Sequence, residues 1–434
     1  MERLSEYIAG TRSGLLDSAL VEFYGEDGLT QQRQRYQMLL GRMEKWAGDG
    51  DVVLVSAPGR TELGGNHTDH NHGVVLAAAV SFDCLAVAFP SDSNCIRVRS
   101  EGFAETIEVD LSDLSSQESE TGTPAALIRG VADAFSCAGF AIGSFDACIA
   151  GSVPVGAGLS SSAAFEVCIG QIFNQLFNEG AVPPIELARF GRWAENRYFG
   201  KPCGFMDQIA CAVQGVQSID FLDQENPIVS EVDFDFSGTG YQLVVVDTGG
   251  SHADLTPEYA AIPDEMTRAA RVLGQDFARG LTVEQVLESA LKIRRQAGDR
   301  ALLRLIHFIE ENQRAIAEAE ALRHNDMATF LELVSQSGDS SWRLLQNCTS
   351  TMKPEEQGVT LALTLTERFL EGEGAWRIQG GGFAGTIQAY VPEERFAPYT
   401  KYMESVFGRG AVVPLRIRTS GHDRILLNSM VGDA

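Results

Sequence analysis

The chain has 434 residues and carries 34 lysines and arginines against 59 aspartates and glutamates, which gives a formal net charge of −25. Apolar residues make up 44% and charged residues 21%, an ordinary globular composition that excludes disorder or a fibrous repeat over most of the chain. The acidic balance argues against nucleic acid as the main partner, because most of such a surface repels a phosphate backbone.

Compartment and partners follow from the apolar runs and the cysteines. No apolar run approaches the roughly 20 residues that a membrane helix needs, and the N-terminal segment MERLSEYIAG is unlike a secretory signal. The eight cysteines form no CxxC pair and are scattered through apolar segments, where a free thiol behaves as a small hydrophobic group. We therefore expect a cytoplasmic protein with reduced cysteines, no nucleic-acid or membrane partner, and a monomer or weak homo-oligomer.

The first half of the chain is predicted to begin with helix and to continue with buried strands. Apolar spacing favours helix over about the first 45 residues, with Leu39, Met43 and Trp46 on one face. In chain order we then expect a strand over 51–56, one or two buried strands over 73–89, half-exposed strands over 96–111, a surface loop over 112–123, a helix over 124–138, a strand over 145–149, a deeply buried helix over 164–177 and a helix over 184–200.

The second half is predicted to be richer in helix. We expect a strand over 243–247, helices within 258–335 that include a long one over 302–323, a helix over 360–369, and strands over 386–391 and 412–417. A soft domain boundary is placed near 215–240.

The segment from Gly151 to Ala163 (GSVPVGAGLSSSA) places glycines and three consecutive serines just before the buried helix. Glycines let backbone N–H groups approach a ligand closely, and a helix N-terminus attracts anions through its dipole and free amides. One serine is enough to cap a helix, so three favour a phosphate-binding loop over a plain capped turn. The Walker pattern GxxxxGK[ST] does not occur, which excludes a P-loop NTPase.

A second polar segment, from Ala57 to Gly73 (APGRTELGGNHTDHNHG), lies between two apolar runs. Its many donors and acceptors suit a polyhydroxylated ligand, which is the interpretation we prefer. A metal site is the second hypothesis, because histidine and aspartate side chains crowd into His67, Asp69, His70 and His72. A plain polar turn is the third.

Two further motifs are ambiguous when each is taken alone. In AENRYFGKPCGFMDQ, Asp207 falls near the start of a helix, where the dipole favours its ionised form, but Asp207 and Glu195 can equally be ordinary helix residues. The run 380–385 matches GxGxxG, yet a strand-like run follows it instead of a helix, which excludes a nicotinamide or flavin site. It remains either a glycine-rich wall of an active site or a tight hairpin turn.

Taken together and in this order, GRTELGGNHTDHNHG, PVGAGLSSSAAFEV, AENRYFGKPCGFMDQ and QGGGFAGT resemble the galactokinase branch of the GHMP sugar and small-molecule kinases. The resemblance implies an α+β fold of two domains with the active site between them. The N-terminal αβ domain, over 1–220, is expected to be like ribosomal protein S5, and the C-terminal αβ domain, over 221–434, to be ferredoxin-like.

The resemblance also implies an ATP-dependent kinase that phosphorylates the anomeric (C1) hydroxyl of a sugar, with galactose as the default. Asp207 aligns with the family's catalytic base, Arg60 with its transition-state stabiliser, and Ser162 and Glu195 with its Mg²⁺ ligands. The expected ATP-binding residues are Gly156, Ala157, Gly158, Leu159, Ser160, Ser161 and Ser162, and the expected sugar contacts are Asn66, His67, Asp69, Gly204 and Tyr259. This requires Arg60 and Asp207 to meet beside the serines.

The chain departs from the family's pattern mainly around the expected sugar site. Asn66 stands where the family has a glutamate that helps to hold the sugar's far hydroxyl, and an amide both donates and accepts hydrogen bonds. Segments 247–250, 262–265 and 344–347 also differ. The alternatives are therefore a kinase of another hexose, a hexosamine or a pentose, or a non-catalytic sensor of ATP and sugar. A metallohydrolase built on the histidines is the outsider.

Overall fold

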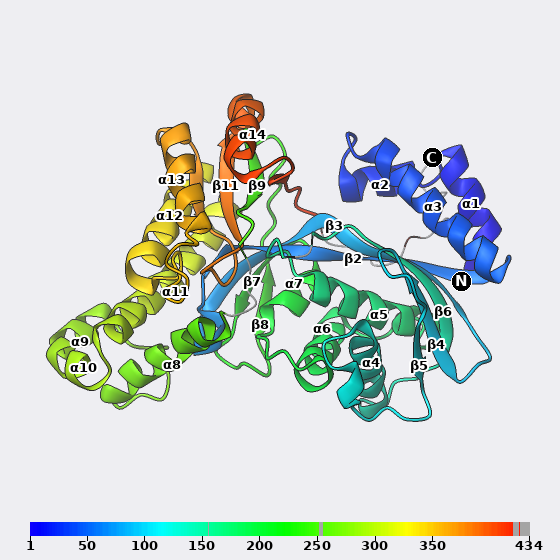
Figure 1. Ribbon diagram of the computed structural model, residues 1–434, viewed down its shortest axis with the longest axis horizontal. Coiled ribbons are helices and arrows are strands. Elements are labelled where there is room, and N and C mark those ends of the chain that lie inside the picture. Colours follow the sequence, from blue (N-terminus) through cyan, green and yellow to red (C-terminus); the bar gives the residue numbers. More distant parts are fainter. Residues whose placement is uncertain (155, 251–254, 420–424, 426–434) are drawn as a thin grey trace.

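The computed structural model describes residues 1–434 except 155, 251–254, 420–424 and 426–434. Among the described residues the strands form an eight-stranded sheet and a four-stranded sheet, with helices packed on both (Figure 1). This arrangement confirms the predicted α+β class. Within the described ranges no helix is both long and apolar enough to cross a membrane. All eight cysteines are free thiols, as expected.

The larger sheet comes from the first half of the chain. Its order is β1-β2-β3-β6-β4-β5, with β7 paired to the first part of β3 and β8 paired to β7. The strands are β1 (Glu2–Arg3), β2 (Asp51–Gly64), β3 (Val74–Pro90), β4 (Cys95–Ser100), β5 (Ile107–Asp110), β6 (Phe145–Gly151), β7 (Val216–Asp220) and β8 (Ile228–Glu231). The helical elements are α1 (Leu4–Ser13), α2 (Asp17–Tyr24), α3 (Leu29–Ala47), η1 (Asp69–Asn71), η2 (Glu118–Glu120), α4 (Pro124–Cys137), α5 (Ser161–Phe177), α6 (Pro184–Ala194), the π-helical turn η3 (Glu195–Phe199) and α7 (Met206–Val213).

Both faces of this sheet are covered, which explains why its central strands are apolar at consecutive positions. Val53 and Val55 of β2 belong to the core formed with α4–α7, whereas Val52 and Leu54 belong to a second core formed with α1–α3. Alternate side chains of a strand point to opposite faces, so a continuous apolar run buries both. Figure 1 shows the two groups of helices on opposite sides of β2 and β3.

A buried carboxylate ties the N-terminal helices to the sheet. Asp83 of β3 is inaccessible to solvent and accepts hydrogen bonds from Tyr24 Oη and from Arg35 Nη1, both at 2.6 Å. Ser56 Oγ donates to the same carboxylate, and Ser152, near the start of the predicted phosphate-binding segment, donates to its Oδ1 at 3.2 Å. The pKa of Asp83 lies below its usual value, because Arg35 and these donors outweigh the effect of burial.

The smaller sheet comes from the second half and has the antiparallel order β10-β11-β9-β12. Val244 and Val246 of β9 pack with α13 and α14, while Leu243 and Val245 belong to the core of the first sheet. The strands are β9 (Tyr241–Asp247), β10 (Ala375–Ile378), β11 (Thr386–Pro392) and β12 (Val412–Pro414). The helical elements are α8 (Thr256–Val272), α9 (Val283–Glu288), α10 (Ala290–Gln296), α11 (Asp299–Arg323), α12 (Met327–Ser340), the π-helical turn η4 (Ser341–Leu345), α13 (Gly358–Leu370) and α14 (Glu393–Phe407).

Buried polar contacts join the two sheets. Arg377 Nη2 of β10 lies 2.6 Å from Glu62 Oε1 of β2, and both side chains are almost inaccessible to solvent. Gln388 of β11 donates to Thr61 Oγ1 at 2.8 Å and to the carbonyl of Glu62 at 3.0 Å. The end of β2 is therefore held against the second sheet, so residues from both halves can contribute to one site.

The structure changes the predicted limits of several elements. The strand expected over 51–56 continues to Gly64, because residues 57–64 also pair with β3 across two irregularities, one between Pro58 and Arg60 and one between Glu62 and Gly64. Arg60 and Glu62 thus lie on a strand and not in a loop. Helix α14 and strands β7, β8 and β10 are absent from the prediction. Strands β7 and β8 fall within the predicted boundary region, and the domain limits themselves stay a prediction.

Candidate active site

An arginine and an aspartate 147 positions apart in the sequence form an ion pair between β2 and α7. Arg60 Nε and Nη2 lie 2.9 and 2.7 Å from Asp207 Oδ1, and Arg60 Nη1 donates to the carbonyl of Gly158. The Arg60 side chain is 7% exposed and that of Asp207 is 31% exposed. Burial opposes the ionisation of Asp207, but the charge of Arg60 and the hydrogen bonds outweigh burial and hold the pKa of Asp207 below its usual value.

Ser160 connects this ion pair to the start of α5. Its hydroxyl donates to Asp207 Oδ2 at 2.5 Å and makes no capping bond to the helix. Ser160 has a φ of 57°, an uncommon left-handed conformation for a residue other than glycine. The first amides of α5 are therefore left without a side-chain cap beside an arginine, an arrangement that attracts an anion.

The loop before α5 is held from both halves of the molecule. The amide of Arg60 donates to the carbonyl of Leu159 at 3.1 Å. From the second half, Gln379 Nε2 donates to the carbonyl of Gly158 and Thr386 Oγ1 to that of Ala157, both at 3.2 Å. These contacts fix the carbonyls of residues 157–159, directly before the start of α5. Gly156 and Gly158 have positive φ values of 83° and 67°, and Val155 lies outside the described residues.

A second pair of polar side chains lies on the first turn of α5 and at the end of α6. Ser162 Oγ donates to Glu195 Oε1 at 2.9 Å, and the Glu195 side chain is 1% exposed. Gln208 Nε2 donates to Glu195 Oε2 at 2.8 Å and to Glu166 Oε2 at 3.0 Å. Glu195 is also the first residue of η3, a π-helical turn of the kind that often occurs at functional sites.

The glycine-rich segment between β10 and β11 forms a wall that faces the end of β2 and α8. His67 Nε2 donates to the carbonyl of Gly381 at 2.8 Å, and Tyr259 Oη donates to that of Gly382 at 2.7 Å. A Cβ added at Gly381 would lie 2.5 Å from a ring carbon of Tyr259, so the close approach needs glycine there. The segment connects the antiparallel strands β10 and β11 and is followed by a strand, as expected, which does not fit a dinucleotide site; its place in an active site stays a prediction.

Asn66 is predicted to contact the sugar directly, but the structure buries it completely. Its Nδ2 donates to Glu62 Oε1 at 3.0 Å and to the carbonyl of Gly380 at 2.7 Å. Its Oδ1 accepts from Asn347 Nδ2 at 2.8 Å and from Ser341 Oγ at 3.4 Å. Protein groups thus occupy the amide on every side, and Asn66 lies behind the wall instead of presenting a free group to a ligand.

Asp69 and Gly204 approach each other from different segments. Asp69 begins the short turn η1 after β2, and its side chain is 14% exposed. A Cβ added at Gly204 would lie 2.6 Å from Asp69 Oδ2, so glycine is required for this contact. Gly204 lies three residues before Asp207, so this contact brings Asp69 next to the segment that leads into α7.

Comparison with known proteins identifies the family. Residues 44–90 match the family model described as the galactokinase galactose-binding signature, and residues 126–215 match the GHMP kinases N terminal domain. A curated galactokinase from Actinobacillus pleuropneumoniae is 31% identical over 364 residues, which cover 83% of this chain and 90% of that protein. The chain belongs to the galactokinase family of GHMP kinases. The protein is therefore a kinase, and ATP is its phosphoryl donor.

Solved structures support the GHMP kinase fold. The structure of Lactococcus lactis galactokinase complexed with galactose has a TM-score of 0.75 at 24% identity and covers 88% of this chain and 98% of that one. A mevalonate kinase from Methanococcus jannaschii has a TM-score of 0.61 at 14% identity and covers 85% of this chain and 99% of that one. The two-domain GHMP kinase fold predicted from the sequence is confirmed.

The histidine-rich segment does not support the metal hypothesis. Within the described ranges, no group of three or more His, Cys, Asp or Glu side chains is placed to hold a metal ion. His67 Nε2 and His72 Nδ1 already face the carbonyls of Gly381 and Leu222. Burial also lowers the pKa of His67 to about 4, so its ring is neutral and donates to Gly381.

The residues predicted to hold Mg²⁺ have the chemistry that this ion prefers. Ser162 and Glu195 offer a hydroxyl and a carboxylate oxygen, which are hard ligands, and the two are already in contact. Glu195 Oε1 also attracts the ammonium of Lys201 at 3.0 Å, so this oxygen is placed to receive a positive charge. The Glu195 side chain is almost completely buried, so water has little access to its carboxylate and the carboxylate depends on a nearby cation.

Several residues of the site are missing from the sequence-based prediction. Gln379 and Thr386 are the first and last residues of QGGGFAGT, and Lys201 lies inside AENRYFGKPCGFMDQ, so their place within these motifs is the signal that the sequence offers. Their contacts to Gly158, Ala157 and Glu195 depend on how the two sheets and the loops meet.

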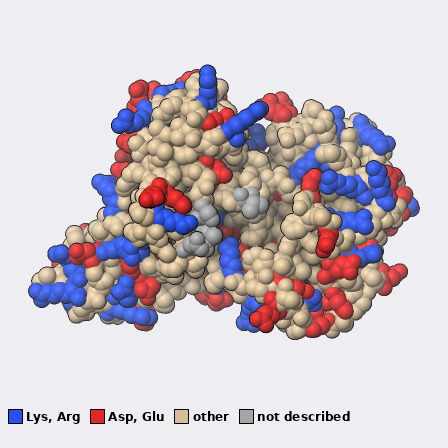
Figure 2. Space-filling model, in the orientation of Figure 1, with Lys and Arg blue, Asp and Glu red and all other residues tan. Residues whose placement is uncertain are grey.

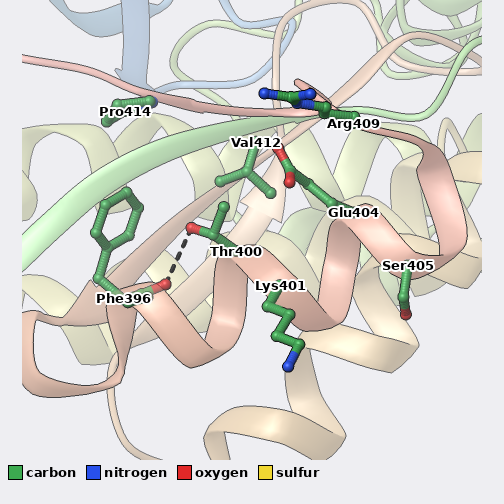
Figure 3. Close-up of a pocket in the computed structure, with 9 residues that line it drawn as sticks. Phe396, Thr400, Lys401, Glu404, Ser405, Arg409, Val412 and Pro414 are labelled. Atoms are coloured by element: carbon green, nitrogen blue, oxygen red, sulfur yellow. Dashed lines mark hydrogen bonds between the residues drawn. The ribbon is translucent and has the colours of Figure 1, made fainter.

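Two surface features lie outside this site. A shallow depression between α14 and β12 is lined by residues such as Phe396, Lys401 and Arg409, none of which belongs to the motifs described above (Figure 3). Figure 2 shows acidic and basic side chains interspersed over the visible face. Neither feature adds a residue to the pair formed by Arg60 and Asp207.

Proposed function

We propose that the protein transfers the γ-phosphoryl group of ATP to the anomeric hydroxyl of galactose. The observation that carries the proposal is the contact of Asp207 with both Arg60 and Ser160 at the uncapped start of α5. An ionised carboxylate, a fixed guanidinium and free helix amides are the groups that phosphoryl transfer to an alcohol requires. Galactose is supported by the match of residues 44–90 and by the curated relatives.

In the proposed reaction Asp207 accepts the proton of the sugar C1 hydroxyl. The C1 oxygen forms a bond to the γ-phosphorus, the bond from that phosphorus to the oxygen of the leaving ADP breaks, and sugar 1-phosphate and ADP result. Arg60 keeps Asp207 ionised and stabilises the charge on the transferred group, a role suited to arginine because it does not lose its proton. Residues 156–162 hold the phosphates of ATP through the loop and the first amides of α5.

Ser162 and Glu195 are proposed to hold Mg²⁺. When bound, the ion supplies neutralisation of phosphate charge, which is a principal requirement of phosphoryl transfer. Gln208 donates to the second oxygen of Glu195 and so fixes the orientation of the carboxylate. Such outer contacts commonly decide how well a ligand side chain is placed.

The sugar is proposed to contact His67, Asp69, Gly204 and Tyr259. Asn66 contributes indirectly, because it holds Gly380 and so the position of the wall. Asn66 stands where the family has a glutamate that helps to hold the sugar's far hydroxyl. This difference is the reason to test sugars other than galactose. The domain limits 1–220 and 221–434, the cytoplasmic location and the monomeric or weakly associated state remain predictions.

The test is to measure ADP formation with a panel of hexoses, hexosamines and pentoses, and to locate the phosphate by NMR of the product. We expect galactose to give the highest kcat/KM and the phosphate to lie on C1. If the protein phosphorylates another sugar of the panel and not galactose, that sugar replaces galactose in the proposal. A protein that binds ATP and sugar without turnover, with the same result for Asp207→Asn, would support the sensor hypothesis instead.

A further inference from the structure

Lys201 is a cation of the site that the proposed mechanism does not use. It lies in the loop between η3 and α7, and its Nζ is 3.0 Å from Glu195 Oε1. The hydroxyl of Ser162 lies 2.9 Å from this same oxygen. The ammonium therefore occupies one of the positions next to the two side chains proposed to hold Mg²⁺.

The surrounding charges explain why a cation rests there. Besides its contact with Glu195, Lys201 lies in the electrostatic field of Asp207 and Glu166. In the described part of the chain, Glu195 forms an ion pair with Lys201, and Asp207 forms one with Arg60. Without these cations, several carboxylates would face a nucleotide that is itself strongly anionic.

The two cations differ in how freely they can move. Arg60 is 7% exposed and its three nitrogens are directed to Asp207 and to the carbonyl of Gly158. Lys201 is 61% exposed, and among the described residues its side chain donates to Glu195 alone. An ammonium on a flexible four-carbon chain has three donors, so two of them are available to a ligand.

We propose that Lys201 exchanges Glu195 for the γ-phosphoryl group of ATP when the nucleotide and its cation are bound, and stabilises that group during transfer. The inference rests on the proposed function. In the absence of nucleotide, Lys201 compensates the charge of the buried Glu195 carboxylate. In its presence, the ammonium supplies a second positive charge to the transferred group, in addition to that of Arg60.

The proposal is tested by Lys201→Met and Lys201→Arg, with Lys401→Met on the remote helix α14 as the matched control. Binding of MgATP and of MgADP is measured by calorimetry, and kcat and KM are measured with galactose. A charge-assisted contact to the γ-phosphoryl group predicts that Lys201→Met binds MgATP about 10- to 100-fold more weakly and MgADP with little change. We expect kcat to fall by about 10²-fold, KM for the sugar to stay within about twofold, and Lys201→Arg to recover part of both effects.

The proposal would be overturned if Lys201→Met changed the affinities for MgATP and MgADP equally, or if its kcat were unchanged. Tighter MgATP binding with unchanged kcat would also overturn it, because Lys201 would then only compete for Glu195. The binding measurement does not depend on turnover. If the wild-type protein phosphorylates no sugar, the proposed function fails, whereas a selective loss of MgATP affinity in Lys201→Met still supports the contact. Thermal unfolding of each variant checks that the fold is retained, as the exposure of Lys201 leads us to expect.

Discussion

Removing the Ser160 hydroxyl is expected to raise the pKa of Asp207 without disturbing the ion pair with Arg60. In Ser160→Ala the 2.5 Å hydrogen bond to Asp207 Oδ2 is lost, while both bonds from Arg60 to Oδ1 remain. Helix α5 loses no cap, because the Ser160 side chain does not bond to its amides. The substitution therefore isolates one of the contributions that keep Asp207 ionised.

The size of the effect follows from the geometry. A hydrogen bond to an ionised group contributes about 1.5–3 kcal/mol, and the lower end applies here because Asp207 is 31% exposed. At about 1.4 kcal/mol per pKa unit, the pKa of Asp207 should rise by about one unit. In the wild type this pKa is depressed below 3.8, so ionisation stabilises the fold above that pH and the contribution is lost as the pH falls through the folded-state pKa.

The assay is the pH profile of kcat/KM, whose acid limb reports the base of the free enzyme. We expect the limb to move about one unit upward in Ser160→Ala. Ser160→Gly is the matched variant, since it removes the same hydroxyl but accepts the left-handed backbone more easily. It should show the same shift and a free energy of unfolding about 1 kcal/mol higher than that of Ser160→Ala. An acid limb that stays in place in both variants would refute the assigned role of this hydrogen bond.

Three further substitutions test other parts of the structure. Asp207→Asn should lower kcat by about 10²–10⁴-fold with a nearly unchanged KM for the sugar, as measured by steady-state kinetics, and retained activity would exclude Asp207 as the base. Asn66→Glu places a second carboxylate beside the buried Glu62, so we expect a loss of about 3–5 kcal/mol in denaturant unfolding, with Asn66→Gln as the uncharged control. Asp83→Ala leaves Arg35 without its buried partner and should lower the free energy of unfolding by about 3–5 kcal/mol near neutral pH. Because the pKa of Asp83 is depressed, the difference in free energy of unfolding from wild type should shrink as the pH falls. A difference that stays constant with pH would contradict this account.

Much of the architecture could be predicted because local patterns dominate in it. The apolar run after residue 163 forms α5, and the runs around 73–89 and 386–391 form β3 and β11. The extension of β2 to Gly64 could not be predicted, because proline and glycines at 58–65 normally end a strand and only the pairing with β3 carries it on. Helix α14 was missed although it follows Pro392, a residue that often precedes a helix.

The four motifs, through their resemblance to the galactokinase branch, predicted the family, which the comparisons confirm, and also the phosphate loop and the residues for phosphoryl transfer, which stay predictions. They could not show that Asn66 is buried behind the glycine-rich wall or that Lys201 contacts Glu195, because both facts depend on segments that are distant in sequence or on loop shape. The tertiary structure also decided that Ser160 donates to Asp207 instead of capping α5. A side chain with several possible hydrogen-bond partners takes the one that folding brings within reach, and only the packed chain specifies which partner that is.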